Sequence, residues 1–317
     1  MKILVTGCAG FIGANFTEYI LDNYPLDTVI GVDCLTYAAN LPALEGLCAR
    51  RGFTFYREDI CNRDAIDKVF ASERPDVVVN FAAESHVDRS IDDSAIFVRT
   101  NVLGTEVLLA ASHKYGVSRF HQISTDEVYG DMPVESKRSF TERSPLRPSS
   151  PYSASKAAAD LLVLSYKRTH GLSVSISRSA NNYGKYQHVE KLIPKAVSFA
   201  LQGEPFTIYG KGDNVRDWIH VSDHCRAVDL IIRHGKSGGV YNVGGNCQLS
   251  NLAIVDKIYA SLGITPAPVC HVADRKGHDR KYALSSDKLM RELGWACEVN
   301  FDRGLADVVE WYAENYK

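Results

Sequence analysis

The chain has 317 residues, of which 45% are hydrophobic and 23% charged, and its formal net charge is −2. This composition is ordinary for a soluble globular protein, and the small net charge gives no electrostatic reason to expect nucleic acid or an anionic membrane as a partner. We expect no apolar run as long as the ~20 residues that span a bilayer. The length predicts one large domain or two cooperating domains.

The opening MKILVTGCAGFIG is apolar, but it is too short and too rich in glycine for a signal peptide. The eight cysteines are scattered, without the close pairs of a zinc site or a redox motif, and the histidines show no ligand spacing. We therefore expect a cytoplasmic protein with reduced cysteines and no bound metal.

The first half of the chain alternates β-branched runs with helical patterns. Continuous apolar strands separated by helices predict a parallel sheet that helices cover on both faces. The expected fold class is α/β, with a doubly wound, mostly parallel Rossmann-type sheet. Strands are predicted at residues 2–6, 28–33, 53–59, 76–82, 119–125 and 172–178, and helices at 11–24, 62–73, 93–114 and 301–316.

A glycine-rich turn joins the first predicted strand to the first helix. Gly7, Gly10 and Gly13 permit a tight turn and let backbone N–H groups and the helix N-terminus approach a pyrophosphate. Asp33 ends the next strand, where a carboxylate can accept hydrogen bonds from an adenosine ribose and would repel a 2′-phosphate. The pattern predicts a dinucleotide site that prefers NAD to NADP.

Two adjacent acids follow the strand predicted at 119–125. In STDEVYGD, residues 124–131, Asp126 and Glu127 stand where a parallel strand delivers its carboxyl end to a site. Polar residues also end strands without any chemical role. Neighbouring carboxylates can serve as an acid and a base only if their environments separate their pKa values.

A tyrosine and a lysine stand four residues apart at the start of a later helix. Pro151 favours a helix start, so Tyr152 and Lys156 share one helix face. A lysine ammonium stabilises a nearby phenolate and lowers the pKa of the phenol. Tyr152 could then remove a proton from a sugar hydroxyl while hydride leaves the same carbon.

Strand signals weaken after residue 180, and helices and loops dominate. We expect residues 1–180 to form the NAD-binding domain with the catalytic residues. Residues 181–317 are expected to form a smaller, mixed domain that mainly binds substrate, with some chain interleaved with the first.

The motifs together resemble a known family. Gly7-x-x-Gly10-x-x-Gly13, Tyr152-x-x-x-Lys156 and NNYG at 181–184 resemble the extended short-chain dehydrogenases that act on nucleotide sugars. Within that group STDEVYG, AAESHVDRS, EKLIP, GKGDNVRDWIHV and DRKGHDRKY are similar to the dTDP-glucose 4,6-dehydratases, over essentially the whole chain. Sister epimerases generally lack the Asp–Glu pair, which makes Thr125-Asp126-Glu127 the discriminating feature.

The resemblance implies a hydro-lyase that converts a nucleoside-diphosphate hexose, dTDP-glucose first, to its 4-keto-6-deoxy derivative. It implies oxidation at C4, loss of water across C5 and C6, and return of hydride to C6, so that NAD is regenerated. The implied roles are base for Glu127, acid for Asp126 and a hydrogen bond to the sugar for Thr125. The resemblance also implies a homodimer that packs segments 93–114 and 152–169 into a four-helix bundle.

The remaining site residues are assigned mainly through the resemblance, and several of them are equally ordinary packing, turn or solvated residues. The cofactor contacts implied are Gly7, Gly10, Phe11, Ile12, Gly13, Asp33, Leu35, Thr36, Asp59, Ile60, Phe81, Ala82, Ala83, Ser85, Thr100, Tyr152 and Lys156. The substrate contacts implied are Ser85, Thr125, Asn181, Lys191, Leu192, Arg216, Asn251, Arg275 and His278.

Three features depart from the family pattern. Cys8 occupies a loop position that often holds glycine, Lys185 replaces a proline after NNYG, and the segment 131–150 is short. The last two bear on the choice of base and sugar. The alternatives are a UDP-glucose dehydratase, a dehydratase of an N-acetylated sugar, an epimerase and a non-catalytic NAD sensor.

Overall fold

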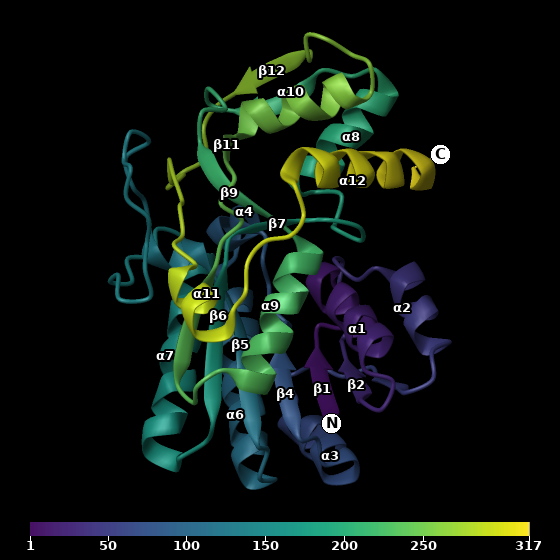
Figure 1. The fold of residues 1–317 in the computed structure, drawn as a ribbon, viewed down its shortest axis with the longest axis vertical. Coiled ribbons are helices and arrows are strands. Elements are labelled where there is room, and N and C mark those ends of the chain that lie inside the picture. Colours follow the sequence, from purple (N-terminus) through teal and green to yellow (C-terminus); the bar gives the residue numbers. More distant parts are fainter. Residues whose placement is uncertain (317) are drawn as a thin grey trace.

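The computed structural model describes residues 1–316. Its main element is a seven-stranded parallel sheet in the order β10-β6-β5-β4-β1-β2-β3 (Figure 1). The α/β class and the Rossmann-type sheet predicted from the sequence are confirmed. The strands are β1 (Lys2–Thr6), β2 (Thr28–Val32), β3 (Phe53–Tyr56), β4 (Val77–Asn80), β5 (Arg119–Thr125), β6 (Val174–Ser179) and β10 (Gly239–Val243).

The two faces of this sheet carry separate hydrophobic clusters. Because side chains alternate along a strand, Leu4 of β1 packs on one face while Ile3 and Val5 pack on the other. Both faces are buried, so the strands consist of continuous apolar runs. The first face is covered by α3 (Arg63–Glu73), α6 (Thr105–Lys114) and α7 (Pro151–His170), and the second by α1 (Phe11–Asn23), α2 (Leu41–Cys48) and α9 (Val221–His234).

The second half of the chain builds a smaller layer above the carboxyl ends of the large sheet (Figure 1). It has its own core, in which Trp218, Ile254 and Tyr312 are buried. Its helices are α8 (Leu192–Gln202), α10 (Asn251–Ser261) and α12 (Phe301–Asn315), and its strands are β7 (Asn181–Tyr183), β8 (Phe206–Tyr209), β9 (Val215–His220), β11 (Gln248–Ser250) and β12 (Val269–Val272). Helix α11 (Asp287–Leu293) lies lower, against α9 (Val221–His234) and β10.

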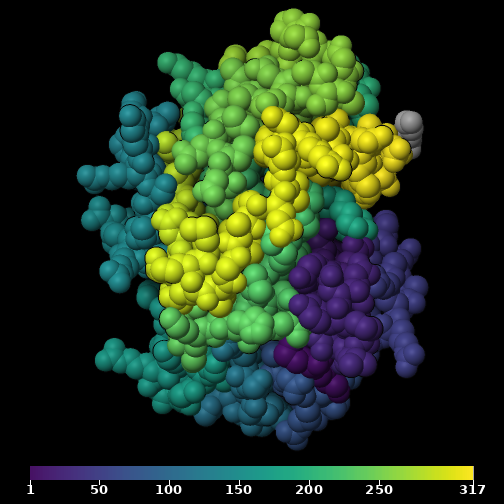
Figure 2. All heavy atoms as spheres, viewed as in Figure 1, coloured from purple at the N-terminus to yellow at the C-terminus, as the bar shows by residue number. Residues whose placement is uncertain are grey.

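The two halves are interwoven. The chain returns from the upper layer through α9, which packs against α1, and through β10, which pairs with β6 at the edge of the large sheet. Figure 2 shows the C-terminal segment, coloured yellow, lying across the surface of both layers.

The segment predicted as one helix at 93–114 is continuous but not uniform. After α4 (Val87–Asp92) come α5 (Ser94–Phe97), a π-helical stretch at Val98–Gly104, and α6. Ser94–Lys114 has 21 residues and a mean hydropathy of 1.3, so by length and composition it could cross a membrane, contrary to our expectation from the sequence. In the structure its last part is a core helix, with Val107, Leu108 and Leu109 buried against the large sheet.

Candidate active site

A cavity of about 550 Å³ lies at the carboxyl ends of the parallel strands. Parallel α/β sheets bind ligands at this edge because loops from several strands meet there. The residues after β1, β2, β3, β4, β5 and β6 all contribute to its lining. The cavity therefore brings together the glycine loop, the acidic pair and the Tyr–Lys pair that the sequence singled out.

The glycine loop has no space for a side chain at Gly7 or at Gly13. Gly7 has φ +67°, and a Cβ atom there would lie 2.7 Å from the backbone nitrogen of Ala82. A Cβ on Gly13 would lie 2.1 Å from the carbonyl oxygen of Gly7. The loop is thus an all-backbone cradle at the start of α1, which fits the pyrophosphate of a dinucleotide.

Asp33 ends β2 beside this cradle. Its carboxylate accepts hydrogen bonds from the backbone N–H of Ala9 at 3.0 Å and of Leu35 at 2.8 Å. Burial raises the pKa of Asp33, while these two hydrogen bonds favour the charged form. The side chain lines the cavity, so its negative charge stands where a ribose would bind and a 2′-phosphate would be repelled.

The loop after β4 is tied to two helices by one buried amide. Asn101, in the π-helical stretch, exchanges two hydrogen bonds with the backbone of Glu84, at 2.9 and 3.0 Å, and donates a third to Ser155 of α7 at 2.8 Å. The adjacent Thr100 lines the cavity. Such π-helical stretches often occur at functional sites, and this one fixes the loop that carries Ser85.

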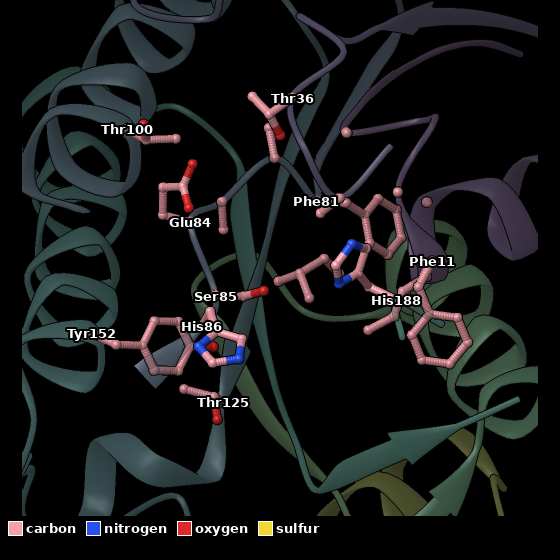
Figure 3. A pocket seen from close by; sticks show the side chains of 18 of the residues that line it. Phe11, Thr36, Phe81, Glu84, Ser85, His86, Thr100, Thr125, Tyr152 and His188 are labelled. Atoms are coloured by element: carbon pink, nitrogen blue, oxygen red, sulfur yellow. The ribbon is translucent and has the colours of Figure 1, made fainter. Parts of the chain in front are cut away.

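Helix α7 begins at a capping box and carries the tyrosine and lysine into the cavity. Ser150 and Ser153 satisfy each other's backbone N–H groups, and Pro151 occupies the first turn. Tyr152 and Lys156 are both buried and both line the cavity. Figure 3 shows Tyr152, Thr125 and Ser85 around a common space.

The electrostatics of this pair differ from the prediction that Lys156 lowers the pKa of Tyr152. Burial, followed by the negative charges of Glu127 and Asp126, raises the pKa of Tyr152 instead. The Lys156 ammonium donates to the carbonyl oxygen of Ile123 at 2.6 Å, and burial lowers its pKa to about 8. The lysine is therefore held by the backbone of β5, and burial and the two acids determine the direction of the pKa shift of the phenol.

The acidic pair lies in a short 3₁₀ helix, Asp126–Tyr129, that follows β5. The Thr125 hydroxyl donates to Asp126 at 3.2 Å and accepts from the backbone N–H of Glu127 at 3.3 Å. Among residues 1–316, no group hydrogen-bonds to the second carboxylate oxygen of Asp126, which is buried. A buried polar atom of this kind requires a partner, and the cavity is where a ligand would supply it.

The environments of the two acids are not equal. Burial raises the pKa of Asp126 well above its ordinary value, and the charges of Glu127 and Asp217 raise it further. Burial also raises the pKa of Glu127, but the cations Arg216 and Lys191 act against that rise. Asp126 is therefore the better proton donor of the pair, and Glu127 is the better proton acceptor.

The structure brings nearly all predicted cofactor residues into the cavity lining, with the exception of Leu35, which follows Asp33 at a φ of +59°. Of the predicted substrate residues, Ser85, Thr125, Asn181 and Lys191 line the cavity. The predicted substrate residues outside that lining are Leu192, Arg216, Asn251, Arg275 and His278, all in the upper layer.

Some of these upper-layer residues are engaged with protein groups. The Arg216 guanidinium donates to the carbonyl oxygen of Asp279 at 2.9 Å and lies 4.4 Å from the centre of the Tyr282 ring. Arg275 forms an ion pair with Asp88 at 2.5 Å. Arg216 still lies close enough to Glu127 to oppose the rise in its pKa, so the upper layer borders the end of the cavity that holds the acidic pair.

Several lining residues were not predicted from the sequence. They share no single motif and come from loops that only the fold brings together. The AAESHVDRS run contains two of them and the EKLIP run a third, but neither run was assigned to these side chains. They include Tyr37, Glu84, His86, Arg99, His188 and Glu190. Within the described residues 1–316, no three His, Cys, Asp or Glu side chains are grouped as metal ligands would be.

Each of the three departures from the family pattern is accommodated by contacts within the protein. Cys8 is buried, and a Cβ atom on Gly31 would lie 2.6 Å from its sulfur, so glycine in β2 makes room for it. Lys185 pairs with Glu18 of α1 at 2.6 Å. Segment 131–150 lies against the short helix at 126–129: the backbone N–H of Arg147 donates to the carbonyl oxygen of Val128 at 3.0 Å, and the Phe140 ring stacks on Tyr129 at 5.1 Å.

Known proteins share this architecture over their whole length. The family described as GDP-mannose 4,6 dehydratase matches residues 4–308. The dTDP-glucose 4,6-dehydratase of Shigella flexneri is 45% identical over 99% of this chain and 93% of its own. The structure of the Streptomyces venezuelae dTDP-glucose 4,6-dehydratase, solved with NAD and dTDP bound, has a TM-score of 0.95 and 46% identity, covering 99% of this chain and 98% of that one.

A sister activity has the same fold at lower identity. The structure of the UDP-glucose 4-epimerase of Thermotoga maritima has a TM-score of 0.90 and 31% identity, and each chain is covered completely. A Rossmann-type sheet, a glycine cradle and a Tyr–Lys pair in one cavity define an extended short-chain dehydrogenase. Within that class, the chain belongs to the NAD-dependent epimerase/dehydratase family, among the dTDP-glucose 4,6-dehydratases.

Proposed function

We propose that this protein is an NAD-dependent hydro-lyase that converts dTDP-glucose to its 4-keto-6-deoxy derivative. The observation that carries the proposal is the buried Asp126–Glu127 pair, which shares one cavity with Tyr152 and Lys156. An epimerase needs only the Tyr–Lys pair, whereas loss of water needs a second acid and a second base.

The residues present fit NAD as the resident cofactor. The backbone cradle at Gly7, Gly10 and Gly13 would hold the pyrophosphate, and Asp33 would face the adenosine ribose and select NAD over NADP. NAD, when bound, supplies a positively charged ring that accepts a hydride from the sugar C4 and, once reduced, returns it to C6. The other predicted cofactor residues that line the cavity would orient the adenosine and nicotinamide halves of NAD.

The chain's own residues carry the proton transfers. Tyr152 removes the proton of the C4 hydroxyl, while Lys156 is held one turn away by Ile123. Once C4 is a ketone, the C5 proton becomes acidic and Glu127 removes it. Asp126, whose pKa is raised by burial, by Glu127 and by Asp217, donates a proton to the departing C6 hydroxyl. Thr125 hydrogen-bonds the sugar beside both acids.

The nucleotide part of the substrate would lie toward the upper layer. The Lys191 ammonium, held by the carbonyl oxygen of Ser85 at 2.8 Å, stands between the two layers, where a diphosphate would bridge them. Arg216 and Arg275 offer guanidinium groups whose geometry matches phosphate oxygens. This supports the division in which residues 1–180 bind NAD and residues 181–317 mainly bind the sugar nucleotide.

We also propose an assembly and a cellular location for the protein. The protein forms a homodimer through α7 and the Ser94–Lys114 segment. Both carry exposed apolar side chains, Leu161 in α7 and Val98 and Leu103 in the segment. It works in the cytoplasm, where thiols remain reduced.

The test of the function is product identification. The purified protein is incubated with dTDP-glucose, UDP-glucose, a UDP-N-acetylhexosamine and GDP-mannose, and products are identified by mass spectrometry and NMR. We expect a 4-keto-6-deoxy product from dTDP-glucose, formed without net consumption of NAD. A faster reaction with UDP-glucose would contradict the proposal that dTDP-glucose is the substrate. A product inverted at C4 would contradict the proposal that the protein is a dehydratase.

A further inference from the structure

Three side chains from distant segments meet beside the mouth of the cavity. Tyr37 follows β2, Arg89 lies in α4, and Glu190 precedes α8. The Arg89 guanidinium lies 3.7 Å from the centre of the Tyr37 ring and donates to a Glu190 carboxylate oxygen at 2.7 Å. We refer to Tyr37, Arg89 and Glu190 as the clasp.

Each end of the clasp is attached to the cavity wall. The Tyr37 hydroxyl donates to Glu84 at 3.2 Å, and the ring of His188 meets the Tyr37 ring edge-on at 5.6 Å. The Glu190 carboxylate also lies 3.5 Å from the His86 imidazole. These contacts connect the loop after β2, the loop after β4 and the loop before α8 into one closed ring.

The clasp stands between the cavity and solvent. Tyr37 and Glu190 line the cavity on one side and are partly exposed on the other, while the Arg89 side chain is 46% exposed. In the view of Figure 3, His188 lies on the side of Phe11 and Phe81, where the cradle begins. A dinucleotide in the cradle would therefore be covered by the loops that the clasp connects.

We propose that the clasp closes the cavity over the dinucleotide and sets the rate at which the cofactor leaves. This inference rests on the proposed NAD-dependent reaction, in which the same cofactor must stay bound between the two hydride transfers. The loops after β2 and before α8 have to separate before the cofactor can escape. Separation breaks the cation–π contact and the ion pair together, because both use the one guanidinium.

The test measures the release of NADH without any sugar present. Protein loaded with NADH is mixed with excess NAD, and the loss of bound-NADH fluorescence gives the dissociation rate. Arg89→Met keeps the aliphatic stem but removes both contacts, and we expect release to be faster on the order of tenfold. Arg63→Met is the matched control, because Arg63 forms an exposed ion pair with Glu106 at 2.6 Å outside the cavity lining. It should release NADH at the wild-type rate.

A second variant keeps the test decisive if Arg89→Met does not fold. Tyr37→Leu removes the ring but leaves the Arg89–Glu190 pair, and it should also speed release. If the folded variants release NADH at the wild-type rate, the proposed role of the clasp in cofactor release is wrong, whatever the protein does to dTDP-glucose. A wild-type protein that binds no NADH would overturn the cofactor in the proposed function and the clasp with it.

Discussion

At the scale of single residues, the burial of Lys156 lowers the folding stability of the protein. The ammonium is buried, with Ile123 as the acceptor of its hydrogen bond, and burial lowers its pKa from 10.5 to about 8. A buried charge in such a setting costs folding free energy, of about 3 kcal/mol for a shift of this size. We propose that the residue is retained for its part in the reaction, at a cost in folding stability.

Lys156→Met should therefore stabilise the cofactor-free protein at pH 7 by up to about 3 kcal/mol while abolishing turnover. The unfolded state binds more protons than the folded state between pH 8 and 10.5. Wild-type stability thus rises with pH through this window, and the advantage of the variant should shrink there. Urea unfolding at neutral and alkaline pH measures the effect, and Lys167→Met, at an exposed position of α7, is the control. A pH-independent difference would contradict this account.

At the scale of elements, the apolar outer positions of two adjacent segments predict the dimer. Val98 is 55% exposed and Leu161 of α7 is 60% exposed, and α7 packs against the π-helical stretch that contains Val98. In a two-fold dimer each substitution occurs in both subunits, so charges placed in this interface would be buried without partners from both sides.

The double substitution Val98→Glu with Leu161→Glu should convert the dimer to monomers in sedimentation at micromolar concentration. Leu201→Glu, at a 45% exposed position of α8 away from these segments, should leave the dimer intact. A wild-type protein that sediments as a monomer, or a double variant that remains dimeric, would contradict the proposed dimer interface.

The elements also show which parts of the fold were predictable. Strands and the glycine turn were predictable because their signals are local, such as the apolar run of β5 and the spacing of Gly7, Gly10 and Gly13. Helix α2 was not predicted, since eight residues with Gly46 inside them carry little periodicity. The return of β10 to the large sheet was not predicted either, because strand pairing over long separations depends on tertiary contacts.

The same distinction holds for the site. The carboxylates of Asp126 and Glu127 were recognisable because a strand end places them in the cavity. The raised pKa of Tyr152 was not, because it results from burial and from acids 25 and 26 positions earlier in the chain. The clasp was also not predicted. Arg89 and Glu190 lie in the AAESHVDRS and EKLIP runs, but nothing in either run indicates that they meet at Tyr37.

At the scale of the whole molecule, the two layers divide the work around one cavity. The large sheet delivers the cradle, the acids and α7, while the upper layer brings cations toward the same space. We propose that Tyr152 serves oxidation at C4 and that Asp126 and Glu127 serve the loss of water. These steps can be separated because oxidation at C4 precedes elimination.

The most direct measurement is single-turnover absorbance at the NADH band after addition of dTDP-glucose, paired with solvent-deuterium incorporation at C5. Tyr152→Phe should form no NADH. The double variant Asp126→Asn with Glu127→Gln should still accumulate enzyme-bound NADH, incorporate no deuterium, and turn over roughly two to four orders of magnitude more slowly. Normal turnover in the double variant, or loss of NADH formation as complete as in Tyr152→Phe, would contradict the account.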